Sequence, residues 1–422
     1  MSTLRAEAFP ESAIRARARY GAACAFPDPG EYGGALFGAD PARRVVAGDP
    51  VDQLRLVSPV FVPRRLDKLA ELAREPVYRD VELDTLVGGF RSTLPLYVSA
   101  FGSTEAASVN LGLSVGRQAG RLGIPMVVGE NVMPVNGYGR IEEERAGRSL
   151  LARITAYAEQ ALDGRGGVVV QQSTEDADAE VWNLVYSDPN VQALLESGRL
   201  AFELKVGQGA KPGLGGMTVL DTVMATRLAD AFTIDPVFGA GSTAVLRSSS
   251  PGTFTDEILR HQIRLMRNNF PRARAWVKLP PARDVREAAF VAWEAGADAV
   301  TVDGAEGGTG WAPLAFLQHV GLPLGECLRR IGKHPSCLLA SGRMWEGARV
   351  AKCLALGANA VGLGRAALIA VDTDPEEGLV NLVECLSLEL QMLTSALGKY
   401  HVGLLSLEDV WSGAEAAWSP AG

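Results

Sequence analysis

The sequence predicts an α/β fold, a closed (β/α)8 barrel of the TIM type, with an N-terminal extension and a long insertion after the fourth strand. From about residue 95, short apolar runs, glycine-rich or polar turns and helical patterns follow one another in a regular order. The apolar runs number eight, which is enough to close a barrel. The first strand-turn-helix unit reads SAFGSTEAAS and lacks the three-glycine spacing that an open dinucleotide-binding sheet would carry there.

The candidate strands are short and mostly apolar. They are 95–100, 125–129, 168–172, 201–206, 275–279, 299–304, 337–342 and 360–364. The stretches between them carry apolar residues at spacings of three and four, as helices packed on a sheet do. Two of these stretches end at Gly296 and Gly357, and glycine is a favourable residue at a helix C-terminus. The alternation therefore favours parallel β/α units.

Two regions interrupt the alternation. Residues 1–90 are rich in proline and charge, and we expect them to form an N-terminal extension packed on the barrel, which takes residues 91–422. The connection from about 207 to 274 is far longer than a usual strand-to-helix loop. We expect it to hold a helix or two and to cover the site.

Composition narrows the classes of function. A formal net charge of −8 provides no basic field for a polyanion, so nucleic acid is not expected as a main partner. No run of about 18 apolar residues is present, so no membrane span is expected. The N-terminus lacks the apolar core of a signal peptide, which predicts a cytoplasmic protein.

The cysteines give no sign of a disulfide framework or a metal site. There are five of them, widely spaced and without a C-x-x-C pair. We expect buried, unreactive thiols and no bound metal.

The turns after the seventh and eighth strands predict a phosphate site. In a β/α barrel the loops after the strands form the active face, and phosphate is commonly held there. Small residues let backbone N–H groups approach an anion, and the following helices offer their positive N-termini. The residues concerned are Ser341, Gly342, Arg343, Gly362, Gly364 and Arg365. A single such turn would be read as structural; two together, preceded by GGTG, favour phosphate.

Two lysines stand in unusual settings. Lys278 lies inside the apolar run WVKLPP, where lysine is rare without a partner. If it points into the barrel mouth it can face a delocalised anion, such as the edge of a reduced flavin; otherwise it extends to water at a strand end. Lys211 lies in the glycine-rich segment GQGAKPGLGG, which would bring it close to a carboxylate or a cofactor.

These motifs together resemble a known family. GQGAKPGLGG, then VKL, then DGAEGGTGWAPLAFLQHVGLP and GANAVGLGRAALIA are similar to the FMN-binding synthase domain of glutamate synthases and their stand-alone relatives. Order and spacing hold from about residue 90 to the closing GKYHVGLLSLEDVW. The combination is much more specific than a lone glycine motif.

The resemblance implies a set of site residues. FMN would contact Ser99, Ala100, Phe101, Gly102, Gln172, Lys278, Gly307, Gly308, Thr309, Gly310 and the six residues of the phosphate turns. Substrate would contact Gln208, Lys211, Met217 and Arg227, and Arg227 is also readily explained as an exposed helical arginine. For catalysis the resemblance points to Lys211, Glu130 and Lys278, with Glu130 or Lys211 as the group that transfers a proton.

Several departures from the family pattern bear on function. The three-cysteine iron-sulfur motif is reduced to Cys385, so no iron-sulfur cluster is expected. Met217 stands where glutamate synthases have a polar glutamine, which makes the expected pocket less polar. The chain starts with Met-Ser and shows no N-terminal cysteine nucleophile, so no glutaminase activity is expected.

The resemblance thus predicts an FMN-dependent oxidoreductase that transfers hydride between flavin N5 and the carbon of an amino, imino or hydroxy acid or an amine, in a specialised biosynthetic pathway or in amino-acid metabolism. Two alternatives stay open: a glutamate synthase-type subunit that takes electrons from a partner protein, and a non-catalytic flavin- or phosphate-binding barrel. A sugar-phosphate or nucleotide enzyme without redox chemistry would use the same turns. We expect a small-molecule amino or oxo acid or amine as the substrate, an electron-transfer protein as one route for electrons, and a homo-oligomer.

Overall fold

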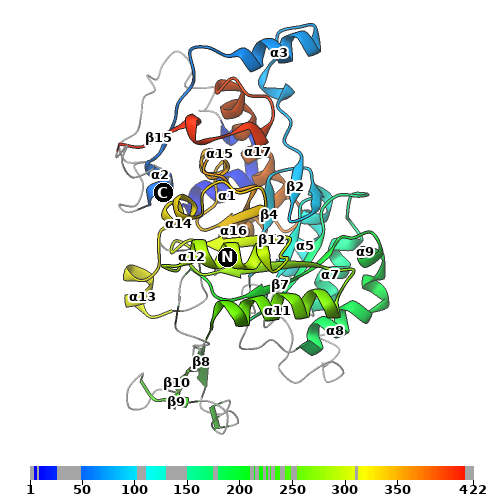
Figure 1. The fold of residues 1–422 in the computed structure, drawn as a ribbon, viewed down its shortest axis with the longest axis vertical. Coiled ribbons are helices and arrows are strands. Elements are labelled where there is room, and N and C mark those ends of the chain that lie inside the picture. The colour runs from blue at the N-terminus through cyan, green and yellow to red at the C-terminus, as the bar shows by residue number, and fades with distance from the viewer. Residues whose placement is uncertain are drawn as a thin grey trace.

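A closed parallel barrel forms the centre of the computed structural model (Figure 1). The structure describes residues 4–6, 9–25, 49–101, 111–129, 150–173, 179–209, 213, 218–221, 225–226, 229, 233–237, 243–248, 254–308 and 312–413. The barrel strands are β4 (Leu96–Val98), β5 (Met126–Val128), β6 (Val168–Ser173), β7 (Leu200–Lys205), β11 (Arg274–Leu279), β12 (Ala299–Asp303), β13 (Cys337–Ser341) and β14 (Ala360–Leu363). They pair in chain order, and β14 closes on β4, which confirms the predicted barrel.

Helices surround the strands. Those that follow barrel strands or pack between them are α5 (Leu111–Leu122), α7 (Leu150–Ala158), α8 (Ala179–Ser187), α9 (Gln192–Glu196), α11 (Asp256–Asn269), α12 (Val285–Glu294), α13 (Leu314–His319), α14 (Leu324–Ile331), α15 (Gly347–Ala355), α16 (Arg365–Thr373) and α17 (Gly378–Ala396). Thr255 begins α11, since its side chain accepts a hydrogen bond from the Ile258 N–H. No described helix is long and apolar enough to span a bilayer.

Side-chain alternation along the strands separates two apolar layers. On β7, Phe202 and Leu204 face the outer layer between strands and helices, while Ala201 belongs to the layer inside the barrel. The inner layer is built around Trp276, which is fully buried and donates from Nε1 to the Gly88 carbonyl at 3.0 Å. Gly88 lies in the turn between β2 (Thr85–Val87) and β3 (Phe90–Ser92), so this hairpin closes the N-terminal end of the barrel.

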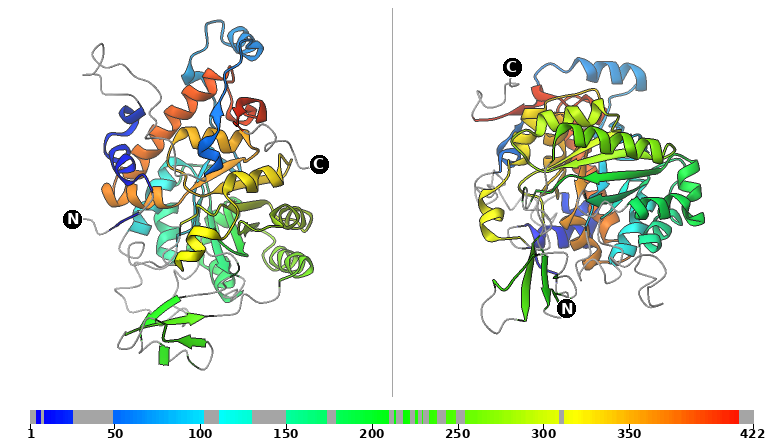
Figure 2. Two further views of the ribbon diagram at one scale, coloured as in Figure 1. Left: turned by 90° about the vertical axis from the view of Figure 1, so that its left-hand side faces the viewer. Right: turned by 60° about the horizontal axis from the view of Figure 1, so that its bottom comes forward.

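The insertion after β7 has a content that the sequence did not predict. It carries a small antiparallel sheet of β8 (Thr218–Asp221), β10 (Ala244–Ser248) and β9 (Thr233–Asp235), in that order. The views of Figures 1 and 2 agree that this sheet stands away from the barrel. The expected helix is present as α11, which is the ordinary barrel helix before β11.

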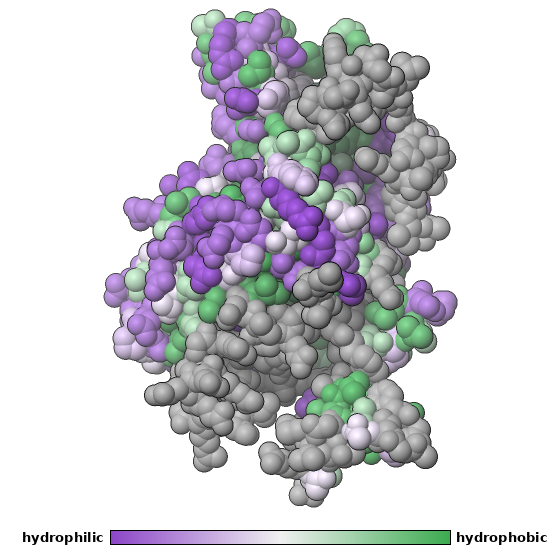
Figure 3. Space-filling model, turned by 180° about the vertical axis from the view of Figure 1, so that it is seen from behind, coloured by the Kyte–Doolittle hydropathy of each residue, from purple (hydrophilic) through white to green (hydrophobic). Residues whose placement is uncertain are grey.

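The N-terminal segments contact the C-terminal part of the chain. Helix α1 (Glu11–Tyr20) packs on α16 and α17, and the short helix α2 (Pro50–Gln53) contacts α14 and α15. Helix α3 (Pro63–Leu72) stands at the end of the molecule opposite the small sheet (Figure 2), and β1 (Arg55–Leu56) pairs with β15 (Val410–Trp411). The face seen in Figure 3 is largely hydrophilic over the described helices, as expected of helices with one side on a core.

A buried ion cluster joins α2 to α15. The Arg349 side chain is fully buried, and its Nη1 lies 2.7 Å from Asp49 Oδ2 and 2.8 Å from Asp52 Oδ1. The other side of the guanidinium donates to the Gly342 carbonyl, with Nη2 at 3.0 Å. Lys352 donates to the Asp52 carbonyl at 3.1 Å. The cluster therefore fixes both the N-terminal segment and the turn after β13.

Replacing Arg349 by methionine should destabilise the protein strongly. The change leaves Asp49 and Asp52 buried with too little positive charge, and breaking a buried ion pair costs about 3–5 kcal/mol. Urea unfolding followed by circular dichroism measures the loss. Arg329→Met is the matched control: Arg329 pairs with Glu326 within one helix near the surface, where pairs contribute less than about 1 kcal/mol. Equal losses in the two variants would contradict the assigned role.

Candidate functional site

The site lies at the C-terminal ends of the barrel strands, where three neighbouring strands bring polar side chains together. Lys278 is the next-to-last residue of β11, Asp303 the last of β12 and Ser341 the last of β13. All three side chains are at least nine-tenths buried. Parallel strands in register place these residues at one rim, as the pairings of Lys278 with Thr301 and of Asp303 with Ser341 show.

Asp303 connects the elements of this rim. Its Oδ2 lies 3.3 Å from Lys278 Nζ and accepts the Gly209 N–H at 3.0 Å, while its Oδ1 accepts the Ser341 hydroxyl at 2.8 Å. A carboxylate buried at this depth needs such partners to offset the loss of water. The Asp303 side chain thus holds together the loop after β7, Lys278 and the end of β13.

The loop after β7 approaches the end of β12 very closely. A Cβ atom on Gly209 would come within 1.9 Å of the Gly304 carbonyl oxygen, so no larger residue fits there. Gly307 is similarly confined, because a Cβ atom would lie 2.7 Å from Asp303 Oδ1. The glycines of GQGAKPG and GGTG therefore let two loops meet at Asp303.

Ser99 contributes a polar group from the end of the first barrel strand. Its N–H donates to the Leu363 carbonyl at 3.0 Å, which holds it beside β14. Its Oγ is buried and interacts with the hydroxyl of Tyr97 in β4. Ser99 is therefore held at the rim from both its backbone and its side chain.

The turn after β13 adopts left-handed backbone. Gly342 has φ of 131° and Arg343 has φ of 58°, a conformation that is uncommon for arginine. The Arg343 Nη1 is paired with Asp52 of α2, and its Nε is buried without a hydrogen-bond partner among the described residues. One edge of the guanidinium is thus engaged by the N-terminal segment.

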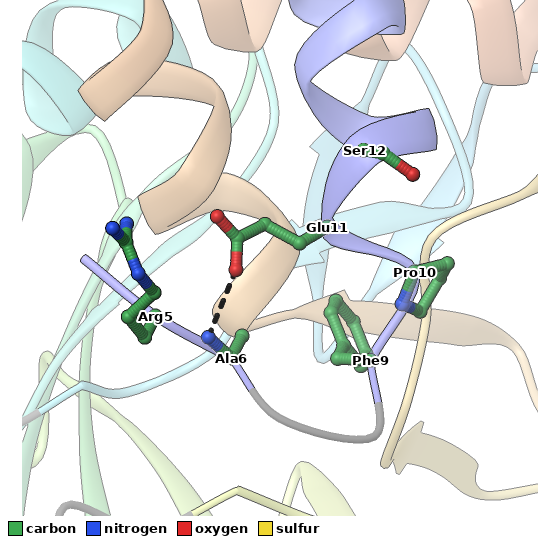
Figure 4. A pocket seen from close by; sticks show the side chains of 6 residues that line it. All are labelled: Arg5, Ala6, Phe9, Pro10, Glu11 and Ser12. Carbon is green, nitrogen blue, oxygen red and sulfur yellow. Dashed lines mark hydrogen bonds between the residues drawn. The ribbon is translucent and has the colours of Figure 1, made fainter.

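The turn after β14 leads directly into α16. Arg365 donates from Nη2 to the Glu306 carbonyl at 2.7 Å, and its guanidinium carbon lies 4.3 Å from the centre of the Phe9 ring. Burial lowers the pKa of Arg365 to about 10, which still leaves it charged at neutral pH. Phe9 also lines a small cavity with Arg5, Ala6, Pro10, Glu11 and Ser12 (Figure 4), in which Glu11 accepts the Ala6 N–H.

Glu306 is a half-buried carboxyl directly before the GGTG segment. It accepts the Leu324 N–H at 2.9 Å, at the start of α14. Burial, together with the nearby carboxylate of Asp49, raises the pKa of Glu306 to about 7. This position therefore holds a group that titrates near neutral pH.

Other residues predicted from the sequence lie near the same rim. Phe101 packs on the outer apolar layer and Ala100 on the inner one. Gln172, near the end of β6, donates from Nε2 to the Gln171 carbonyl at 3.1 Å, and Gln208 is half-buried in the loop after β7. Gly308 packs beside Arg365. The predicted residues Gly102, Glu130, Thr309, Gly310, Lys211, Met217 and Arg227 lie outside the described part of the chain.

Sequence reasoning missed two acidic residues of the barrel. Asp303 follows the apolar run VTV directly, and a carboxylate at that point was a signal available in DGAEGG. Glu203 lies inside the apolar run AFELKV, the same pattern that singled out Lys278. Within the residues described, no group of three or more potential metal ligands is present.

The comparisons with known proteins place the chain in a family. A sequence model of the conserved region in glutamate synthase matches residues 137–377. A glutamate synthase large subunit-like protein of Rhizobium meliloti is 37% identical over 184 residues, which cover 42% of this chain and 40% of that protein. An archaeal glutamate synthase [NADPH] of Archaeoglobus fulgidus is 26% identical over 342 residues, 77% of this chain and 58% of its own length.

A solved structure shows the same fold. A variant of flavocytochrome b2 with sulfite bound superposes with a TM-score of 0.55 over 88% of this chain and 78% of its own, at 16% identity. The fold and the residues at the rim define the class of protein, which is a β/α barrel with a glycine-lined mouth. The matched residues make up more than half of this chain. The chain therefore belongs to the glutamate synthase family. The aligned part of the chain covers about a third to three fifths of the length of the curated glutamate synthase relatives.

Asp303→Asn should destabilise the protein and loosen the rim. The amide preserves the shape of the side chain but leaves the Lys278 ammonium buried without its carboxylate, a loss of about 3–5 kcal/mol for a buried pair. Chemical unfolding measures it. Asp284→Asn, at an exposed position before α12, is the control and should change stability by less than about 0.5 kcal/mol. A loss in Asp303→Asn no larger than in the control would show that the pair is not formed.

Glu306→Gln should change how stability depends on pH. The ordinary value for this group is 4.5, so between about 4.5 and 7 the folded chain holds more protons than the unfolded chain, and stability falls as pH rises. The glutamine variant should lack this decline, which urea unfolding at pH 5, 6, 7 and 8 measures. Glu326→Gln is the control, because nearby Arg329 lowers the pKa of Glu326 to about 2 and its contribution is lost only in acid. Parallel curves for wild type and Glu306→Gln would refute the assignment.

Proposed function

We propose that the chain is an FMN-dependent oxidoreductase that transfers hydride to or from the carbon of an amino, imino or hydroxy acid or an amine. The observation that carries the proposal is the buried Lys278–Asp303 pair at the rim of a glycine-lined barrel mouth. Membership of the glutamate synthase family and likeness in fold to a flavocytochrome support it.

The residues at the turns after β13 and β14 fit a phosphate group. Helix α16 begins after Gly364, and no side chain caps its first N–H groups. A Cβ atom on Gly364 would have no atom nearer than 3.9 Å, so there is room beside these donors. Unsatisfied N–H groups at a helix start attract anions, and Arg365 and the free edge of Arg343 add positive charge. Ser99 borders the same space, because its Cβ is the atom 3.9 Å from a Cβ built on Gly364.

FMN, when bound, would supply a ring that accepts or gives a hydride. The Lys278 ammonium would then be placed to stabilise negative charge on that ring, which a preorganised cation does most effectively in a water-poor setting. Asp303 would keep Lys278 in place. Ser341 and Gly209, through the same carboxylate, keep the surrounding loops at a fixed distance.

The substrate side of the proposal rests on the resemblance to the family. Lys211 and Gln208 would hold the carboxylate of the substrate, and Glu130 or Lys211 would move the proton. Met217, in place of the family's glutamine, favours a substrate less polar than 2-oxoglutarate. Electrons would enter or leave through a second substrate, oxygen or a partner protein rather than an iron-sulfur cluster. A homo-oligomer in the cytoplasm is part of the same proposal.

The alternative functions differ in which molecule would reduce the bound flavin. A glutamate synthase-type subunit would be reduced by its protein partner and reoxidised by 2-oxoglutarate with ammonia. A binding barrel without turnover would hold flavin that no amino or hydroxy acid bleaches.

The protein should bind one equivalent of FMN and be bleached by one member of an anaerobic panel of amino acids, amines and hydroxy acids. Absorbance near the flavin bands measures both steps. Lys278→Met should retain FMN and reduce the rate of bleaching by about 10²–10³, the usual loss when one charge-stabilising donor is removed. Lys333→Met, at an exposed lysine, should behave as the unaltered protein. No uptake of FMN would refute the proposal, and uptake without bleaching would favour the binding barrel.

A further inference from the structure

A polar cluster lies inside the barrel, one layer below the rim. We call it the interior cluster; it consists of Gln171 on β6, Glu203 on β7 and Thr301 on β12. The Glu203 side chain is 1% exposed. Its Oε2 accepts a hydrogen bond from Gln171 Nε2, and its Oε1 accepts the Thr301 hydroxyl at 3.2 Å. Gln171 and Thr301 are neutral donors, so neither of them balances a charge on Glu203.

Strand register places the Glu203 carboxyl beneath Lys278. Glu203 of β7 is level with Trp276 of the neighbouring strand β11, whereas Thr301 of β12 is level with Lys278. To reach Thr301, the Glu203 side chain must therefore cross the inner face of β11 between Trp276 and Lys278. The carboxyl consequently passes directly under the lysine stem, on the side away from the mouth.

The groups that face Glu203 come from several strands. They are Tyr97 on β4, Gln171 on β6, Lys205 on β7, Trp276 and Lys278 on β11, and Thr301 and Asp303 on β12. Lys278 and Lys205 carry positive charge and Asp303 negative charge. Since Lys278 is already paired with Asp303, an ionised Glu203 would compete with Asp303 for the same ammonium.

The Glu203 carboxyl can take up a proton without any movement of the heavy atoms around it. If Oε1 carries the proton, its O–H donates to Thr301 Oγ1 across the same 3.2 Å, and the threonine hydroxyl turns away. Oε2 continues to accept from Gln171. Burial raises the pKa of Glu203, with the charge of Lys278 as the largest opposing influence.

We propose that Glu203 is a positioning residue for Lys278, and that it holds a proton while the site works. A neutral Glu203 leaves the ammonium paired with Asp303 at the rim, facing the mouth. Loss of the proton to solvent creates a second carboxylate below Lys278, which draws the ammonium down and away from the mouth. The inference rests on the proposed function, because it assigns Glu203 a role only if a reduced flavin lies above Lys278.

The affinity of reduced relative to oxidised FMN tests this role. The holoprotein is titrated in the unaltered form, as Glu203→Gln and as Glu196→Gln, an exposed control on α9. The midpoint potential is measured from pH 6 to 10. The unaltered protein and the control should lose about tenfold in relative affinity for reduced FMN, beyond the flavin's own pH dependence, as Glu203 ionises. Glu203→Gln should match them at pH 6 and lack that loss.

A second variant covers the case in which Glu203→Gln does not fold. Gln171→Leu removes a donor that favours the ionised carboxylate, so the same loss should occur at higher pH. The inference is overturned if Glu203→Gln follows the unaltered protein throughout, or, where it does not fold, if Gln171→Leu leaves the pH of the loss unchanged. Failure to bind FMN in every form would instead refute the proposed function, so the two outcomes are distinct.

Discussion

The carboxylate of Asp303 is the contact on which the rim of the barrel depends. It pairs with Lys278, accepts the Ser341 hydroxyl and accepts a backbone N–H from Gly209. Three strands and one long loop therefore share one buried acceptor. Because both oxygens are engaged and water is largely excluded, movement of any one element would leave a charged or polar group unsatisfied. The geometry at the mouth is thus set cooperatively, and the position of Gly209 is tied to the direction of the lysine.

Below this rim, the interior of the barrel changes from apolar to polar along the strands. Trp276 and its neighbours fill the closed end, the interior cluster of Gln171, Glu203 and Thr301 forms the middle, and Asp303 and Ser341 form the top. Lys278 connects the two polar layers. In the inference drawn above, the proton on the lower carboxyl determines whether Lys278 stays paired with Asp303. In this view, the polar residues inside the barrel influence the direction of Lys278 as much as the residues at the mouth do.

The sequence predicted the barrel well, because eight apolar runs separated by helical patterns are compatible with few arrangements of strands and helices. The place of Lys278 in a strand and of Gly342 and Gly364 after strands also agrees with the prediction, since a charge in an apolar strand and glycines after strands are strong local signals. The antiparallel sheet after β7 was not, because its strands are short and lack clear alternation. Asp303 and the partnership of Arg343 with Asp52 were missed for another reason: both depend on residues far apart in the chain, and spacing alone does not show which charges meet.

The buried cluster around Arg349 links the N-terminal segment to the centre of the fold. Asp49 and Asp52 come from a segment that precedes every barrel strand, yet they neutralise a guanidinium that holds the turn after β13. A chain shortened to the barrel would keep the arginine and lose both acids. The segment before the barrel thus supplies the counterions of Arg349, which any recombination of this barrel with a different N-terminal region would have to replace.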